Sequence, residues 1–170
     1  MKIEKFTEPS VLALTVNARR IGYALFQGLN EPTIWGIREF KNIDGCYDEA
    51  RTLLQTYAPA ALVLPATDNQ HSRLSQDVHE MVDHVAVVAG ECDIEVTRFT
   101  RNDIRDCFST YNATTKQEIA EAVGAIVPEF ARCVPRPRKE WEGEQHSMIL
   151  FDALSLIVTF YETERQQPDG

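Results

Sequence analysis

The chain has 170 residues, 44% of them hydrophobic, which suits one compact domain that buries about two-thirds of its unfolded surface. A net charge of −9 argues against strong non-specific affinity for DNA, because phosphate binding depends on lysine and arginine displacing counterions. Apolar runs fall short of the ~20 residues that a membrane helix needs, and the charged N-terminus does not resemble a signal peptide, so we expect a cytoplasmic protein without a membrane segment.

The first part of the chain predicts three antiparallel strands. Apolar residues alternate over 11–16, a polar turn follows at 17–20, and β-prone residues continue over 22–27. Turn-forming residues then precede a third β-rich run over 33–40. Such closely spaced strands pair as hairpins.

Helices alternate with buried strands in the middle of the chain. The spacing of apolar residues from Ala50 onward predicts a helix that ends at Pro59, and the apolar run 60–64 is typical of a strand buried on both faces. A long amphipathic helix is expected over 70–90, with Gly90 as its stop, followed by a strand over 94–99.

Two short helices follow the last strand. Thr100 or Asn102 is expected to cap a helix around 104–108. The next helix begins after its own threonine cap and is stopped by Pro128; the two candidate caps are Thr114 and Thr115.

The end of the chain combines an irregular segment with a helix. Prolines make the basic segment 132–141 extended or irregular, and a final apolar helix is predicted over 144–161. We expect one domain over 1–170, with its core at about 10–162 and a flexible tail over 163–170. The order of elements predicts an α/β fold: a mixed five-stranded sheet, with its three antiparallel strands first, flanked by helices.

Three short segments resemble one family. Residues 11–24, VLALTVNARRIGYA, are similar to the first strand and turn of the RuvC-type Holliday junction resolvases and their YqgF relatives, in the ribonuclease H-like superfamily. Lys116 resembles the lysine that opens a late helix in that family. Asp152, followed by alanine and leucine, resembles the Asp-Ala-Leu motif of its closing helix. The resemblance implies a ribonuclease H-like fold.

The same resemblance implies a degenerate metal site. In those enzymes carboxylates hold two Mg²⁺ ions, which stabilise the attacking and leaving oxygens of an in-line displacement. The matching positions here are Thr15, Pro65, Ile149 and Asp152. Asp152 is the only surviving acid, and one carboxylate cannot hold two divalent cations. We therefore expect no metal cofactor, with Asp152 either a remnant of the site or a helix acid that hydrogen-bonds to nearby backbone or arginine.

An alternative keeps the enzyme active with displaced ligands. The candidates that would join Asp152 around Mg²⁺ are Asp68, just past the fourth strand, or Glu144 and His146 on the last helix. Helical phase argues against His146, because it lies well around the helix from Asp152. The four cysteines and four histidines show no zinc-ligand spacing, which favours scattered reduced thiols and surface histidines.

Basic residues are the candidates for phosphate contact. In the family that the chain resembles, the late lysine and the loops beside the active cleft face DNA, which suggests a local basic patch that binds DNA or RNA. The alternative is ordinary surface solvation with pairing to the abundant acids. The candidates for nucleic-acid binding are Arg19, Arg20, Lys116, Arg136, Arg138 and Lys139.

Three functions remain open from the sequence. The first is a catalytically inactive, RuvC-like module that binds structured nucleic acid or a protein partner, as a homodimer formed through the apolar face of the helix at 70–90. The second is an active metal-dependent endonuclease for junctions or other structured nucleic acids. The third is a scaffold for protein interactions, which the acidic balance permits.

Overall fold

The computed structural model describes residues 8–66, 76–139, 141–143 and 145–166. Its centre is a five-stranded sheet in the order β3-β2-β1-β4-β5. Neighbours β1–β2 and β2–β3 are antiparallel, whereas β1–β4 and β4–β5 are parallel. The predicted mixed sheet with three antiparallel strands first is confirmed. The strands are β1 Val11–Val16, β2 Arg20–Phe26, β3 Pro32–Glu39, β4 Ala61–Pro65 and β5 Glu95–Phe99.

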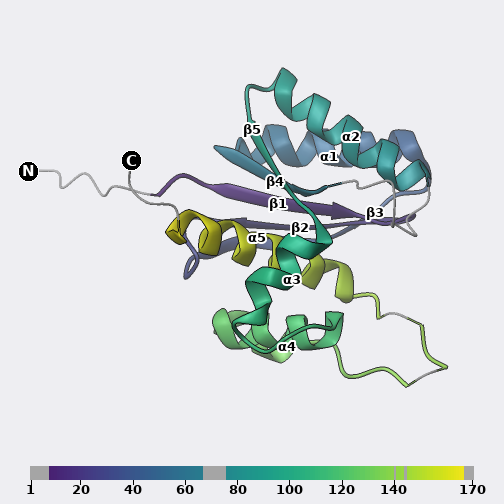
Figure 1. Cartoon of the computed structure of the whole chain (residues 1–170). Coiled ribbons are helices and arrows are strands. Elements are labelled where there is room, and N and C mark those ends of the chain that lie inside the picture. Colours follow the sequence, from purple (N-terminus) through teal and green to yellow (C-terminus); the bar gives the residue numbers. More distant parts are fainter. Residues whose placement is uncertain (1–7, 67–75, 140, 144, 167–170) are drawn as a thin grey trace, which may run out of the picture.

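Helices cover both faces of the sheet (Figure 1). On one face lie α1 and α2, and on the other lies α5, with α3 and α4 packed outside it. A 3₁₀ turn, η1, follows α4. The helical elements are α1 Ile43–Tyr57, α2 Gln76–Glu91, α3 Arg101–Ser109, α4 Lys116–Ile126, η1 Pro128–Cys133 and α5 Met148–Gln166.

Strand alternation divides the core into two clusters. Leu12 and Leu14 of β1 join the cluster under α1 and α2, whereas Val11 and Ala13 join the cluster under α5. The same alternation turns Thr15 toward α5. Helix α5 is buried at every position from Met148 to Thr159 except Asp152, because it lies between the sheet and the outer helices.

Several predicted boundaries differ from the structure. Helix α1 begins at Ile43, earlier than the apolar spacing from Ala50 suggested, because the Asn42 side chain accepts a hydrogen bond from the Gly45 N–H at 2.8 Å and caps it. Pro128 ends α4 as predicted but also starts η1. Helix α5 begins at Met148 rather than 144, so helical phase does not apply to His146.

Helix α5 also continues to Gln166, so residues 163–166 are helical, and the flexibility expected over 163–170 stays a prediction. Long side chains there keep good helix propensity, and the Arg165–Glu162 pair at 3.7 Å spans one turn.

The apolar face of α2 packs inside the molecule. Val78, Met81, Val82 and Val85 are buried in the cluster with α1 and the sheet. This face already covers the core within one chain, and the homodimer predicted through the helix at 70–90 stays a prediction. The predicted beginning of the helix at 70 lies outside the described residues. No helix within the described ranges is long and apolar enough to cross a membrane.

Candidate functional site

The four positions that match the metal ligands of the resolvases lie at one end of the sheet and in the first turns of α5: Thr15, Pro65, Ile149 and Asp152. The parallel register of β1 and β4 pairs Ala13 with Val63 and, continued by two residues, brings Thr15 level with Pro65. Both residues alternate toward α5. Across β2, Thr15 pairs with Gly22. The carboxyl ends of β1 and β4 therefore face the first turns of α5.

Gly22 allows α5 to approach the sheet at this point. A Cβ atom built on Gly22 would lie only 2.3 Å from the Ile149 carbonyl oxygen and 2.7 Å from its carbonyl carbon. Backbone thus packs on backbone, which only glycine permits. Ile149 is 4% exposed and Thr15 is 9% exposed, so a hydroxyl and an alkyl chain occupy a buried corner in which metal-binding carboxylates are absent.

Asp152, one turn after Ile149, faces the beginning of α4. Its Oδ2 lies 3.4 Å from the Nζ of Lys116, with both side chains partly exposed. The position of Lys116 is fixed by a capping box, in which Thr115 accepts from the Glu118 N–H and Glu118 accepts from the Thr115 N–H. Hydrogen bonds to the Glu118 carboxylate hold the pKa of Glu118 below its ordinary value; the backbone N–H and then the side chain of Thr115 contribute most, followed by the side chain and backbone N–H of Thr114. Of the two residues predicted to cap α4, Thr114 and Thr115, the cap is Thr115.

A second cation lies beside the end of β4. The Arg98 Nε donates to the Pro65 carbonyl oxygen at 3.3 Å, and its guanidinium pairs with Asp83 at 3.0 Å. The position expected to hold a glutamate in the resolvase family is thus bordered by a guanidinium. Within the part of the chain that the structure describes, no three histidine, cysteine or acidic side chains are grouped so as to hold a metal ion.

The candidates for displaced metal ligands are not brought together among the described residues. Asp68 and Glu144 lie outside them. His146 is exposed, in the turn before α5. Among the thiols, Cys46 is fully buried, and burial raises its pKa to about 12. Burial also raises the pKa of the Cys107 thiol, so neither behaves as an activated nucleophile.

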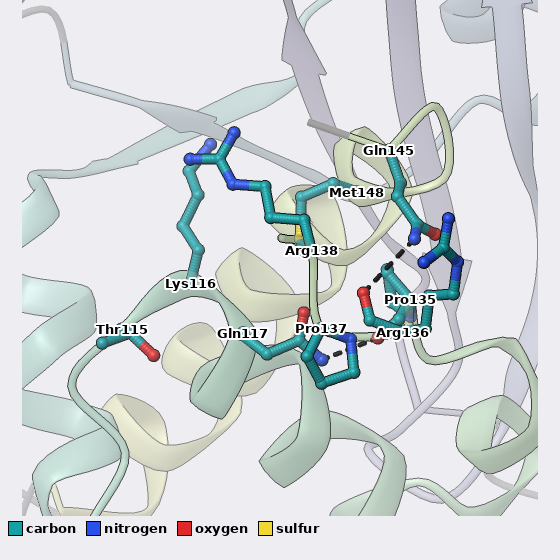
Figure 2. A pocket seen from close by; sticks show the side chains of 9 residues that line it. All are labelled: Thr115, Lys116, Gln117, Pro135, Arg136, Pro137, Arg138, Gln145 and Met148. Carbon is teal, nitrogen blue, oxygen red and sulfur yellow. Dashed lines mark hydrogen bonds between the residues drawn. The ribbon is translucent and has the colours of Figure 1, made fainter. Parts of the chain in front are cut away.

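A cavity of about 250 Å³ opens between the start of α4, the proline-rich segment and the start of α5 (Figure 2). Lys116, Arg136 and Arg138 all line it, although they come from segments far apart in the chain. In Figure 2 the Lys116 and Arg138 side chains extend to the same side of the cavity, whereas Arg136 points to the other. Three of the predicted basic residues therefore share one surface.

Two glutamines hold this cavity in shape. The Gln117 side chain donates to the Pro135 carbonyl at 2.6 Å, and the Gln145 side chain donates to the Arg136 carbonyl at 3.3 Å. Because prolines leave the segment without regular backbone hydrogen bonds, these side chains replace them. The sequence analysis missed both residues, since no local pattern distinguishes a bracing glutamine from an exposed one.

The remaining basic candidates lie beside the cavity or apart from it. Lys139 lies over the ring of Trp141, with Nζ 5.2 Å from the centroid. Arg19 lies in the β1–β2 turn and Arg20 is the first residue of β2; Asn17 Oδ1 accepts from both backbone N–H groups, at 2.9 and 2.8 Å. Arg20 also pairs with Glu39 at 3.4 Å, and neither arginine lines the cavity.

Comparison with known proteins rests on structure alone. No family model matches the sequence. No curated protein matches it either. Among solved structures, RuvC of Thermus thermophilus in complex with a Holliday junction substrate superposes with a TM-score of 0.67 at 16% identity, covering 94% of this chain and 97% of RuvC. A second Thermus thermophilus RuvC structure gives 0.66 at 16% identity, covering 92% and 96%.

The yeast mitochondrial Holliday junction resolvase is a third neighbour, with a TM-score of 0.59 at 13% identity, covering 96% of this chain and 84% of the resolvase. These overlaps span almost the whole chain and agree with the resemblance seen at 11–24. The chain therefore has a RuvC-like ribonuclease H fold.

Proposed function

We propose that this protein binds structured nucleic acid through the surface formed by Lys116, Arg136 and Arg138, and that it does so without metal-dependent cleavage. The observation that carries the proposal is that these cations line one cavity, Lys116 and Arg138 on one side and Arg136 on the other, beside the position where the fold would hold its catalytic metals. We call this the Lys116 surface.

The charges at this surface favour a phosphate over a metal ion. Asp152 is the one carboxylate at the four positions considered, and the Lys116 ammonium is paired with it. Two Mg²⁺ ions need several hard oxygen ligands at short range. Thr15, Pro65 and Ile149 have no carboxylate group with which to supply them. Lysine and arginine donors are the groups that proteins place against phosphate oxygens.

The overall charge sets a limit on the mode of binding. With a net charge of −9, the rest of the molecule repels a polyanion, so attraction is confined to the local patch. A small number of phosphate contacts gives affinity that falls with salt, but less steeply than in a strongly basic protein. A folded nucleic acid that presents several phosphates at fixed positions suits such a patch better than a featureless duplex.

Two further expectations belong to the proposal. A homodimer through the helix at 70–90 is one of them, to which the side chains of α2 that face away from the core are available. A cytoplasmic location is supported by the four free thiols, because reducing compartments keep cysteines unpaired.

A gel-shift assay with four-way junction DNA tests the proposal, since a junction is the substrate in the Thermus thermophilus RuvC complex. We expect a shift in EDTA that Mg²⁺ or Mn²⁺ does not convert into cleavage. The double variant Lys116→Ala/Arg138→Ala should bind more weakly, whereas Arg51→Ala, on α1 across the sheet, serves as the matched control.

Two results would contradict the proposal in different ways. Metal-dependent cleavage that Asp152→Asn abolishes would show an active nuclease with displaced ligands. Absence of any shift at low salt, for junction DNA and for structured RNA, would favour the protein scaffold.

A further inference from the structure

Trp141 is the most exposed large hydrophobic side chain among the described residues, at 79%. The other tryptophan, Trp35, is half as exposed at 39% and packs edge-on against Phe130 with ring centroids 4.8 Å apart. Trp141 has no such packing contact with another aromatic ring in the described chain. An indole ring left in water gives up a large hydrophobic contribution to stability, so its position calls for a physical reason.

The backbone around Trp141 is held in place. The Glu142 N–H donates to the Lys139 carbonyl at 2.9 Å, which closes a turn with Trp141 near its tip. The Glu142 carboxylate pairs with Arg136 at 3.3 Å, and Arg136 in turn accepts, through its carbonyl, from Gln145. The turn is thus tied to the wall of the cavity that carries the Lys116 surface.

A cation lies over one face of the Trp141 ring. The Lys139 ammonium lies 5.2 Å from the ring centroid, within the range of a cation–π interaction. Since the side chain is nevertheless 79% exposed, the opposite face is open to solvent. A flat aromatic group can stack there without displacing Lys139.

The neighbours of Trp141 favour a nucleobase over a protein side chain. A protein hot spot needs a surrounding ring of contacts that excludes water, but the described residues on either side are exposed or half-exposed, and mostly polar. Arg138 and Lys139 lie within three positions of the indole and can meet phosphates that flank a stacked base, whereas Arg136 is paired with Glu142 at 3.3 Å. Aromatic rings interleaved with basic side chains are the pattern of single-strand binding.

We infer that Trp141 is a stacking platform for an unpaired nucleobase, with Lys139 and Arg138 beside it to contact the flanking phosphates. The inference rests on the proposed function and deepens it: the preferred ligand is a structured nucleic acid that exposes an unpaired base next to the duplex held at the Lys116 surface. Each base has an aromatic face, so the platform is indifferent to sequence.

Fluorescence titration tests the inference, because the chain has two tryptophans. In a Trp35→Phe background Trp141 is the sole indole, and we expect its emission to be quenched by a four-way junction that carries a short oligothymidylate overhang. The same junction with abasic residues in the overhang keeps the phosphates but removes the bases, and it should bind about tenfold more weakly and leave the emission unquenched.

Substitutions give an independent readout. Trp141→Ala should lose about tenfold in affinity for the overhang junction and nothing for the blunt junction, whereas Trp141→Phe should recover most of the loss. Tyr111→Ala, which removes another exposed aromatic ring, is the matched control and should change neither affinity. If Trp141→Ala binds the overhang junction as tightly as the parent does, and the blunt junction still binds, this inference is overturned but the proposed function is not. Failure of both junctions to bind would overturn the proposed function and the inference together.

Discussion

The Nζ atom of Lys116, at the start of α4, lies 3.4 Å from the Oδ2 atom of Asp152, in the first half of α5. Because both side chains are partly exposed, the pair contributes at most about 1 kcal/mol to stability. We predict that Asp152→Asn leaves the free energy of unfolding within that margin and strengthens junction binding about threefold, since it removes the anion beside Lys116. Denaturant unfolding and gel-shift titration measure the two effects. Weaker binding by Asp152→Asn would show that the carboxylate itself contacts the ligand.

The salt dependence of binding should report each phosphate contact. Replacing Lys116 or Arg138 by alanine should lower the slope of log Kobs against log[salt] by about one each. Titrations across a salt series measure the slope, with Arg51→Ala as the control expected to leave it unchanged. If the slope of the Lys116→Ala variant equals that of the parent, Lys116 does not contact phosphate.

Restoring the acids should restore a metal site. We predict that Thr15→Asp/Pro65→Glu/Ile149→Asp is destabilised by about 3–5 kcal/mol without metal, because unpaired charges are placed in a buried corner. Mg²⁺ should recover about 2.7 kcal/mol once its concentration reaches a hundredfold its Kd. Thermal unfolding with and without Mg²⁺ is the measurement. The same triple variant with Asp152→Asn should recover less, and an equal recovery would contradict the shared geometry.

The contact of Gly22 with α5 predicts a severe effect of one methyl group. Gly22→Ala would press its Cβ against the Ile149 backbone, which cannot move aside as a side-chain end can, so we expect a loss of about 3 kcal/mol or more. Gly90→Ala is the matched control, because nothing lies within 4 Å of its Cβ and alanine favours the helix by about 0.5 kcal/mol. Denaturant unfolding should therefore show a lower free energy of unfolding for Gly22→Ala and a higher one for Gly90→Ala than for the parent.

The capping box of α4 predicts a pH effect. The pKa of Glu118 is lowered in the folded chain, so its contribution is complete above its ordinary value of about 4.3 and is lost as the pH falls through the lowered folded value. An NMR titration should show the Glu118 carboxyl and the Thr115 amide shifting together at that lower midpoint. In Glu118→Gln the amide should show no such midpoint; if it still titrates, another group is responsible.

Individual strands were predictable because their sequence signal is local. Period-two alternation over 11–16 directly reflects the two faces that β1 presents, and its bounds agree with the structure. Helix ends were less predictable. Apolar spacing indicated α1 only from Ala50, whereas Asn42 caps the helix eight residues earlier. The first turn of α5 contacts Gly22, a residue far away in the chain, and such a contact has no local signature in the sequence.

The site was predictable only as a set of positions. Family resemblance identified Thr15, Pro65, Ile149 and Asp152, which the structure brings to one end of the sheet. It did not identify the pairing of Lys116 with Asp152, since 36 residues separate them. The braces from Gln117 and Gln145 were missed for the same reason: a hydrogen bond to an irregular segment leaves no periodic trace in the sequence.

The burial of α5 on nearly every side also bears on synthesis of the chain. All five strands leave the ribosome before residue 148, so the apolar side chains of Val11, Ala13, Ala24 and Phe26 await the helix that covers them. Folding of that half of the core therefore waits until α5 has been synthesised, and a nascent chain stalled before residue 148 exposes an apolar sheet face to chaperones and to other copies of itself.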